Sequence, residues 1–484
     1  MSHNHLLPEI SKPGKIGYSL PALDVPPTEL PPKELLRQEL ELPEVSEVEL
    51  MRYFTALSKL NYGVDTGFYP LGSCTMKYNP KWHEDIAKLS GFASINPLQP
   101  EESVQGAMQL MFELQEYLAE ITGMNATSLV PIAGAHGEFT GLLLVKAYHQ
   151  DQGDEARKKI LLTDSSHGTN PASAVMCGFE IGTVASDSEG NVDMKSLESV
   201  MNEEVAALTL TMPTTLGLFD PKILEISQLV HERGGLLGAD GANLNALLGR
   251  VKFGELGYDY VQLNLHKTFS TPHGGGGPGS GPVCVKEGLA DFLPWPLVIK
   301  NDGRYKFVSQ AKSIGRIANF YGNFCVMCKA YAYIRSLGAE GLKEVSENAV
   351  LNANYLKEKL KPYYYLPYDR TCMHEVVFSG KRQKAKGVRT VDIAKRLLDY
   401  GLHPPTVYFP LIVDEALMIE PTETESKQTL DAFVEAMKEI ARDVEENPEI
   451  LHTAPHNTPV RRLDDVRAAR NPDLRWEMRS QGFG

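Results

Sequence analysis

Six short apolar runs alternate with helix-forming segments between residues 128 and 265, and this alternation constrains the fold more than any other feature. The runs are Ser128–Ile132, Lys159–Thr163, Ile181–Ala185, Ala206–Met212, Gly235–Ala239 and Tyr260–Leu265. Helical patterns lie between several of them, for example at Pro221–Arg233. Strands that alternate with helices predict the α/β class, a mostly parallel sheet with helices on both faces. In such sheets, ligands bind at the carboxyl ends of the strands.

The flanking sequence predicts further elements. A proline-rich arm precedes the capping box Ser46-x-x-Glu49, which begins a helix. That helix carries Met51, Phe54, Leu57 and Leu60 on one side. Another helix is expected at residues 105–122, before Gly123. After residue 330, two short strands (Glu375–Ser379, Leu417–Glu420) and an amphipathic helix that carries Leu430, Phe433, Met437, Ile440 and Val444 predict a smaller α+β domain.

The expected organisation has four parts. They are an N-terminal arm with a helical extension over residues 1–104, a large domain over 105–330, a small C-terminal domain over 331–447, and an extended tail over 448–484. The chain has 484 residues, and that length exceeds what one hydrophobic core usually supports.

Charge and hydropathy exclude several classes of partner. The net charge is −14, which makes the chain a poor candidate for binding nucleic acid. No run of about eighteen apolar residues is present, so we expect no membrane span. The first residues lack the pattern of a secretory signal. Six cysteines in 484 residues fit reduced thiols, and we expect a cytoplasmic protein.

Cys325 and Cys328 form a C-x-x-C motif within a mostly apolar helical segment. No second Cys or His pair lies nearby at zinc-binding spacing, so we expect no metal site. A redox role is an alternative, but we favour buried thiols that pack as small hydrophobic side chains.

Two polar segments follow the first two apolar runs. In AGAHGE (133–138), small residues let backbone N–H groups approach an anion at the start of a helix expected near Phe139. A tight turn explains this segment equally well. In SSHGTNP (165–171), Asn170 and Pro171 suit the N-cap and first position of the next helix. His167 could lie over a flat aromatic ligand, although a lone histidine is as often structural.

Two further segments carry a carboxylate and a lysine. Asp240 ends an apolar run and is followed by Gly-Ala, so it could pair with a ring nitrogen while Ala242 leaves room for the ring. The alternative is a helix-capping aspartate. Lys267 follows the last run, where burial favours Schiff-base chemistry. The glycine-rich run 272–282 comes next, and it lacks the Lys-Ser/Thr of a nucleotide P-loop.

Asp240 and Lys267 are 27 residues apart, and each follows a predicted strand. That spacing permits two nearby strands, so both side chains could reach one ring. The ordered set of four segments therefore predicts a pyridoxal 5'-phosphate site, with Lys267 as the Schiff-base lysine.

A resemblance to a known family extends over nearly the whole chain. The segments that carry it are YPLGSCTMKYNP (69–80), AGAHGE (133–138), SSHGTNPASA (165–174), ADGANLNA (239–246), NLHKTFSTPHGGGGPGSGP (264–282), ALMIEPTETESK (416–427) and PVRRLDDVRAARNPDLRW (459–476). The lysine segment and YPLGSCTMK are highly specific. On these segments the chain resembles the glycine decarboxylase P-protein family of the glycine cleavage system, in the second subunit of its split bacterial form.

The resemblance implies fold type I, the fold of aspartate aminotransferase, and assigns roles to site residues. Lys267 would carry the cofactor, Asp240 would pair with its ring nitrogen, and His167 and Ala242 would lie on its two faces. The other expected cofactor contacts are Gly134, Ala135 and His136 at the phosphate, His266 as a helper, and Thr214 or Thr215 at the ring oxygen.

The resemblance also implies an activity and partners. The enzyme would decarboxylate glycine and transfer the aminomethyl group to the lipoyl arm of H-protein, through a channel near the glycine-rich run. His136, His266 and His273 are open candidates for protonating the departing sulfur. A separate first subunit would be needed, in a heterotetramer of two each, with the arm and the tail as candidates for wrapping it. Two rivals stay open: a fold type I decarboxylase that releases a free amine, and a non-catalytic scaffold.

Overall fold

The computed structural model describes residues 6–38, 40, 42–274 and 279–474. The chain divides into two compact units. Residues 67–457 form the first unit, which we call the body. Residues up to 66, together with those from 458 onward, form the second, which we call the terminal unit.

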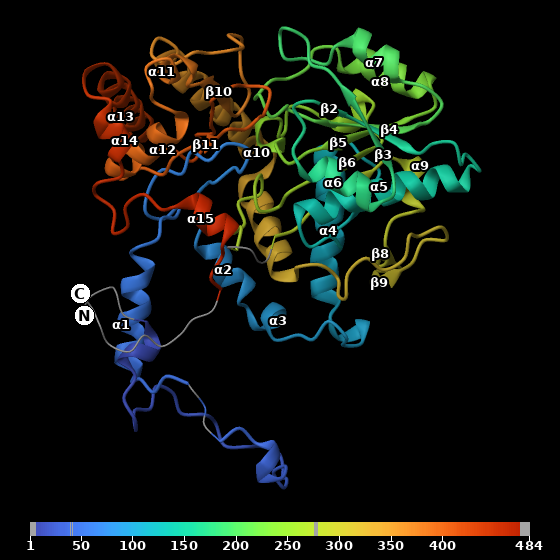
Figure 1. The fold of residues 1–484 in the computed structure, drawn as a ribbon. Coiled ribbons are helices and arrows are strands. Elements are labelled where there is room, and N and C mark those ends of the chain that lie inside the picture. The colour runs from blue at the N-terminus through green and yellow to red at the C-terminus, as the bar shows by residue number, and fades with distance from the viewer. Residues whose placement is uncertain (1–5, 39, 41, 275–278, 475–484) are drawn as a thin grey trace. The chain divides into compact units, whose positions relative to one another are not determined.

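A seven-stranded central sheet is the framework of the body (Figure 1). Its strands, in spatial order, are β1 (Ala126–Ser128), β7 (Val283–Val285), β6 (Tyr260–Gln262), β5 (Leu236–Asp240), β4 (Val205–Thr211), β2 (Lys159–Thr163) and β3 (Glu180–Val184). The pairs from β6 to β3 are parallel, and β7 runs antiparallel to both of its neighbours. The prediction of a mostly parallel sheet is confirmed.

Helices cover both faces of this sheet because the buried strand residues alternate between two apolar cores. Leu161 and Leu237 belong to one core, together with α4 (Gln105–Thr122) and α8 (Ile223–Glu232). Leu162 and Tyr260 belong to the other, together with the two helices α5 (Gly134–Asp151) and α6 (Thr169–Met176). Helix α4 has the expected limits and ends at Gly123, whose φ of 69° is a left-handed cap.

Two expected strands are too long. Of the run Ser128–Ile132, only Ser128 lies in a strand. The N–H of Val130 donates to the Ser128 hydroxyl at 3.4 Å, and Pro131 has no N–H group for a ladder hydrogen bond. Strand β6 ends at Gln262 instead of Leu265. Leu263 donates its N–H to the carbonyl of Pro282 at 2.8 Å, but this proline cannot donate in return.

Two helices begin elsewhere than expected. Helix α5 begins at Gly134 and not near Phe139, so most of AGAHGE forms its first turns. Helix α6 begins at Thr169, so Asn170 is not the N-cap. The Nδ1 atom of His167 accepts the Thr169 N–H at 3.1 Å and supplies the capping hydrogen bond instead.

A three-stranded antiparallel sheet, which we call the small sheet, lies near the C-terminal end of the body. Its order is β10 (Val376–Ser379), β12 (Ala416–Ile419) and β11 (Thr406–Val407). Its helices include α12 (Thr390–Asp399) and α13 (Lys427–Glu446), which gather away from the central sheet in Figure 1. All five apolar residues expected on the amphipathic helix are buried in α13.

Helix α10 (Phe324–Leu360) belongs to both halves of the body. Its first part packs in the core of the central sheet, and Leu356 and Leu360 pack in the core of the small sheet. Gly338 interrupts it with a φ of 62°. The domain boundary expected at residue 330 therefore falls inside this helix, and the four-part division stays a prediction.

The expected extended tail contains two short helices. Residues Glu449–Thr453 form α14 in the body, where Leu451 is buried, so this part of the tail is not extended. Residues Asp465–Arg470 form α15 in the terminal unit.

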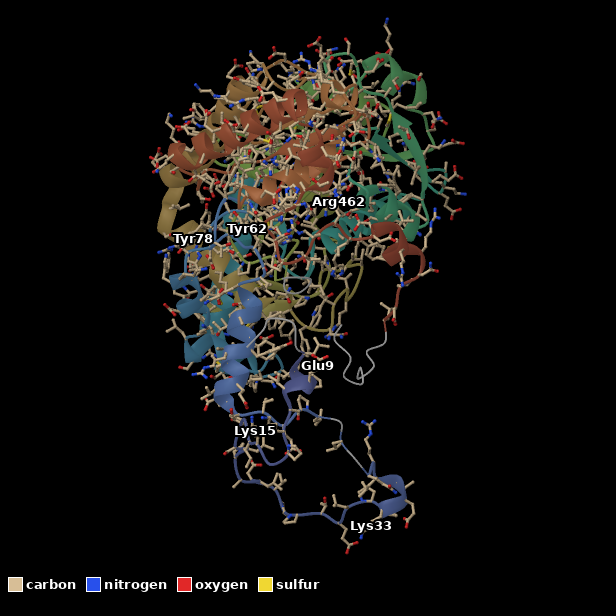
Figure 2. The ribbon with its side chains drawn as sticks, turned by 60° about the vertical axis from the view of Figure 1, so that its left-hand side comes forward. Glu9, Lys15, Lys33, Tyr62, Tyr78 and Arg462 are labelled. Carbon is tan, nitrogen blue, oxygen red and sulfur yellow. The ribbon has the colours of Figure 1, made fainter. Side chains whose placement is uncertain are left out.

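In the terminal unit, α1 (Glu47–Ser58) begins at the expected capping box. Lys15 forms an ion pair with Glu49 of this helix, and Lys33 lies farther along an extended arm (Figure 2). The apolar residues expected on one side of α1, namely Met51, Phe54 and Leu57, are exposed in the single chain. None of the described helices is long and apolar enough to cross a membrane.

Candidate active site

A cavity of about 180 Å³ lies at the carboxyl ends of β4, β5 and β6. Its lining residues are Ser73, Gly134, Ala135, Glu138, His167, Thr169, Thr211, Thr215, Asp240, Ala242, Asn243, Gln262, Asn264, His266 and Lys267. Eight of the residues singled out from the sequence meet here. They are Lys267, Asp240, His167, Ala242, Gly134, Ala135, His266 and Thr215.

Asp240 is the last residue of β5, and the sheet register places it beside Thr211 of β4 and Gln262 of β6. Its side chain is buried, and Oδ1 accepts the N–H of Ala242 at 3.1 Å. Its Oδ2 atom is 3.4 Å from both the amide nitrogen of Asn170 and the hydroxyl of Thr211. A carboxylate held this firmly presents a fixed negative charge to the cavity.

Lys267 lies in a turn after β6, where its N–H donates to the carbonyl of Asn264 at 3.2 Å. Its Nζ atom donates to the carbonyl oxygen of Ser73 at 2.6 Å. Ser73 belongs to the loop 69–80, so the tip of the lysine is held by a segment almost 200 residues away in the chain. The amine can therefore meet a ligand that also touches Asp240.

His167 lies at the exposed wall of the cavity, before α6. Its ring meets Phe409 edge-on, with 5.9 Å between ring centroids. Burial lowers the pKa of the imidazole; the charge of Asp240 opposes this shift and that of Lys267 adds to it, so the ring is neutral near pH 7. A neutral flat ring in this position can stack on a flat ligand.

The N-terminus of α5 forms another wall. Gly134 begins the helix, and its N-cap Ala133 provides no side-chain hydrogen bond. A Cβ atom on Gly134 would lie only 2.4 Å from Oδ1 of Asn264, so glycine is required for this close approach. The free N–H groups of a first helical turn attract an anion.

His136 and Thr214 are not among the residues that line this cavity. The Nδ1 atom of His136 accepts the N–H of Ile132 at 3.2 Å, and the residue lines a neighbouring cavity. The Thr214 hydroxyl accepts the N–H groups of Leu216 and Leu218 and stabilises its own loop. Thr215 does line the cavity and donates to the Ser165 carbonyl at 2.6 Å.

Two histidines meet beside Lys267. The rings of His266 and His273 lie edge-to-face with 5.2 Å between centroids, and Nδ1 of His266 accepts the Ser280 N–H. Burial lowers the pKa of His266 to about 3 and that of His273 to about 4. Both rings are neutral near pH 7. Residues 275–278 of the glycine-rich run lie outside the described residues.

Seven residues that line the cavity were not singled out from the sequence: Ser73, Glu138, Thr169, Thr211, Asn243, Gln262 and Asn264. Glu138 is completely buried, and its pKa is raised well above the usual value by burial and by the charge of Asp240. Its position in AGAHGE could have indicated a functional role, because a charged side chain is rarely buried beside a glycine-rich turn. Ser73 gave no signal beyond the mixed chemistry of its loop.

The residues present fit pyridoxal phosphate. Among the described residues, Oδ1 of Asn170, Oδ1 of Asn243 and both carboxyl oxygens of Glu138 are buried without hydrogen-bond partners. An amine, a fixed carboxylate, a flat ring and a helix N-terminus surround the same space. A ligand that carries an aldehyde, a basic ring nitrogen and a phosphate matches this set.

A larger cavity of about 1080 Å³ adjoins the site and shares Ser73, Ala135, His167 and Thr169 with it. Its remaining lining includes the apolar residues Phe139, Met176, Phe409 and Leu411. Leu411 and Met176 are largely exposed, so the cavity reaches the surface. A long apolar group could therefore enter from this side.

The two cysteines of the C-x-x-C motif were expected to be buried, and this is wrong for Cys325. All six are free thiols, and Cys325 is exposed while Cys328 is buried in the main core. Cys325 lies at the second position of α10, where Val326, Met327 and Cys328 take the side of the helix that faces the core.

Comparison with known proteins identifies the family. The chain is 62% identical over 98% of its length to the probable glycine dehydrogenase (decarboxylating) subunit 2 of Caldanaerobacter subterraneus subsp. tengcongensis, and covers 99% of that protein. It is 58% identical over 98% of its length to the corresponding protein of Bacillus licheniformis, again covering 98% of it. The chain belongs to the family of glycine dehydrogenase (decarboxylating) subunit 2.

Domain models agree with this membership. A model described as the C-terminal domain of glycine dehydrogenase matches residues 345–460, and one for class-V aminotransferases matches residues 102–296. The family predicted from the sequence is thereby confirmed, and the chain is an enzyme of that family.

Solved structures confirm the fold. A glycine decarboxylase (P-protein) of the glycine cleavage system, in inhibitor-bound form, superposes with a TM-score of 0.71 at 23% identity, over 84% of this chain and 93% of that one. A cysteine desulfurase from Thermococcus onnurineus NA1 gives a TM-score of 0.60 at 15% identity, over 78% and 95%. The expected fold type I architecture agrees with both.

Proposed function

We propose that this chain is the lysine-bearing subunit of a cytoplasmic glycine-cleaving enzyme. It binds pyridoxal 5'-phosphate, removes CO₂ from glycine and passes the aminomethyl group to a lipoyl arm. The observation that carries the proposal is the meeting of Lys267 and Asp240 in one cavity. Membership of a family whose relatives are named glycine dehydrogenase (decarboxylating) supports the substrate.

The residues of the chain divide the binding of the cofactor among them. Lys267 would hold it covalently, and Asp240 would pair with its ring nitrogen. His167 and Ala242 would contact the ring. Gly134 and Ala135, at the start of α5, would bind the phosphate, and Thr215 would contact the ring oxygen. His266 is neutral, and because its Nδ1 atom accepts the Ser280 N–H, its Nε2–H could donate a hydrogen bond to the phosphate but would bring no charge to it.

The chemistry divides in the same way. When bound, pyridoxal phosphate supplies a conjugated ring that accepts the electrons of the broken Cα–carboxylate bond. Asp240 stabilises the positive charge on the ring nitrogen that makes this possible. The cavity walls must hold the Cα–carboxylate bond of glycine perpendicular to the ring. The carbonyl oxygen of Ser73 accepts a hydrogen bond from Nζ of Lys267 and would hold this amine while it is not bonded to the cofactor.

Two protein partners complete the proposal. The name subunit 2, carried by the relatives, supports a separate subunit 1, and we propose two copies of each chain. The exposed apolar side of α1 and the arm before it are suited to cover that partner. The apolar cavity of about 1080 Å³ is suited to the lipoyl arm of H-protein, on the side of Phe409 and Leu411. We therefore propose this cavity as the path of the lipoyl arm, in place of the channel expected near residues 272–282.

Exchange of labelled bicarbonate into glycine tests the proposal. We expect label in glycine when the chain is mixed with its partner subunit, lipoylated H-protein and pyridoxal phosphate. H-protein without its lipoyl group is the matched control and should give no exchange. Exchange that does not require H-protein would contradict the proposal and favour a decarboxylase that releases methylamine. A chain that takes up no cofactor at all would favour a scaffold.

A further inference from the structure

The loop that contacts Lys267 has an unusual backbone. Ser73 and Thr75 have φ angles of 57° and 47°, in the left-handed region that side chains other than glycine disfavour. Thr75 is buried, and Gly72 is packed so closely that a Cβ atom there would lie 2.2 Å from the side chain of Met418. A backbone of this kind persists only where its surroundings hold it.

Two glutamates next to the small sheet hold this turn. Glu375, just before β10, accepts the N–H of Ser73 at 2.6 Å and its hydroxyl at 3.0 Å. Glu420, just after β12, accepts the N–H of Thr75 at 2.8 Å and its hydroxyl at 2.6 Å. Both glutamates are completely buried. Each carboxyl group therefore fixes one of the two strained residues at two points.

The turn is joined to β12 by its backbone as well. Leu71 forms a bridge with Ile419, and the N–H of Glu420 donates to the carbonyl of Pro70 at 3.2 Å. Lys77, two residues beyond the turn, is buried and forms an ion pair with Glu423 at 2.7 Å. Residues 70–77 thus follow the small sheet, while the carbonyl of Ser73 reaches Lys267 beside the central sheet.

We propose that Glu375 and Glu420 are positioning residues for Lys267. They fix the turn at Ser73–Thr75, so that the Ser73 carbonyl receives the lysine amine and directs it into the cavity. The inference deepens the proposed function and rests on Lys267 being the cofactor lysine. The small sheet would thus influence the position of Lys267 through the contact between Ser73 and Lys267, although neither glutamate lines the cavity.

The contacts of the two glutamates favour this role over metal binding. Together with His374 they form a group whose ligand atoms lie within 4.8 Å of one another, which a metal ion could occupy. However, all four carboxyl oxygens lie within hydrogen-bond distance of Ser73 or Thr75. Burial raises the pKa of both glutamates, that of Glu420 to about 7, and lowers that of His374 to about 3. The cluster is thus close to neutral without a metal.

The test measures how fast Lys267 takes up pyridoxal phosphate in the full chain, by borohydride reduction and mass spectrometry of the lysine peptide. We expect Glu375→Ala and Glu420→Ala to slow this uptake about tenfold or more, because a small misplacement of a reacting group is costly. Glu375→Gln and Glu420→Gln should restore it, since glutamine keeps an acceptor for the backbone N–H. Glu415→Ala is the matched control.

Glu415 is also buried and precedes β12, but it accepts the N–H of Thr390 at 2.9 Å and leaves the turn untouched. If an alanine variant fails to fold, Glu375→Asp and Glu420→Asp replace it, because they withdraw the carboxyl group and keep its polarity. Uptake at the wild-type rate in folded variants would overturn the inference. An equal loss of uptake rate in Glu415→Ala would also overturn it, as would a loss of uptake rate when a chelator is added to the wild-type protein. A wild-type chain in which pyridoxal phosphate never becomes attached to Lys267 would instead refute the proposed function.

Discussion

Glu138 and Asp240 face the same cavity, and the charge of Asp240 adds to burial in raising the pKa of Glu138. Two carboxyl groups this close cannot both ionise in a buried site. Asp240 has hydrogen bonds to stabilise its charge, whereas neither oxygen of Glu138 has a partner among the described residues. Glu138 is therefore the protonated member of the pair near pH 7.

Replacement of Glu138 by glutamine should change the exchange rate by less than about tenfold, or about 1.4 kcal/mol, because glutamine resembles the neutral acid. The pH dependence of stability should change more. A carboxyl group with a raised pKa in the folded state loses stability as pH rises above its unfolded pKa. Thermal unfolding between pH 5 and pH 9 should thus show a smaller fall for Glu138→Gln than for the wild type. An equal fall in both proteins would show that Glu138 is ionised.

Replacement of Lys267 by alanine should abolish both the absorbance of covalently held cofactor and bicarbonate exchange. Lys252→Ala, at a partly exposed lysine that pairs with Glu120, is the control and should retain both. A Lys267→Ala protein with the wild-type spectrum would disprove the assignment of the lysine.

Replacement of Asp240 by asparagine removes the carboxylate that we propose to pair with the ring nitrogen, and keeps the shape of the side chain. We expect cofactor attachment to continue while exchange falls about a hundredfold, the usual effect of losing one aimed electrostatic group. Asp220→Asn is the control, since Asp220 is equally buried but holds the N–H of Val192 outside the cavity. Equal losses in the two variants would indicate damage to the fold.

Replacement of Gly134 by alanine should weaken the binding of pyridoxal phosphate about tenfold, or about 1.4 kcal/mol. The added methyl group would lie 2.4 Å from the Asn264 side chain and displace the start of α5. In the nearby Gly168→Ala variant, a methyl group would meet nothing within 4 Å. Fluorescence titration of both proteins provides the comparison, and indistinguishable affinities would argue against a phosphate at α5.

The double replacement of Met51 and Phe54 by aspartate should weaken assembly with subunit 1 and leave cofactor uptake unchanged. Both residues are exposed on the apolar side of α1. Arg52→Asp changes charge on the opposite side of the same helix and is the control. Light scattering of the mixed subunits gives the stoichiometry. Normal assembly of the double variant would remove α1 from the interface.

Local sequence patterns predicted most of the central sheet because the strands at its centre, such as β4 and β5, are apolar and fully buried. The patterns failed where one residue changed the hydrogen bonding, as at Pro131 and Pro282. The patterns also placed the start of α5 too late. Glycines such as Gly134 and Gly137 are typical of a turn, but here they lie in the helix, where the absence of a side chain permits close packing.

The site was predictable where its residues follow strands, as for Asp240 and Lys267. Ser73 could not be found in this way, because its contact with Lys267 joins positions 194 residues apart and depends on a turn with no regular structure. The two glutamates that hold that turn lie about 300 and 345 residues away from it, where no local pattern connects them.

The hydrogen bonds from Ser73 to Glu375 and from Thr75 to Glu420 also bear on the order in which the site can mature during synthesis. A ribosome releases the chain from its N-terminus, and domains generally fold as they emerge. Ser73 and Lys267 therefore leave the ribosome well before Glu375 and Glu420 have been translated. The central sheet can form early, but the turn that contacts Lys267 acquires its support only after residue 420 has emerged.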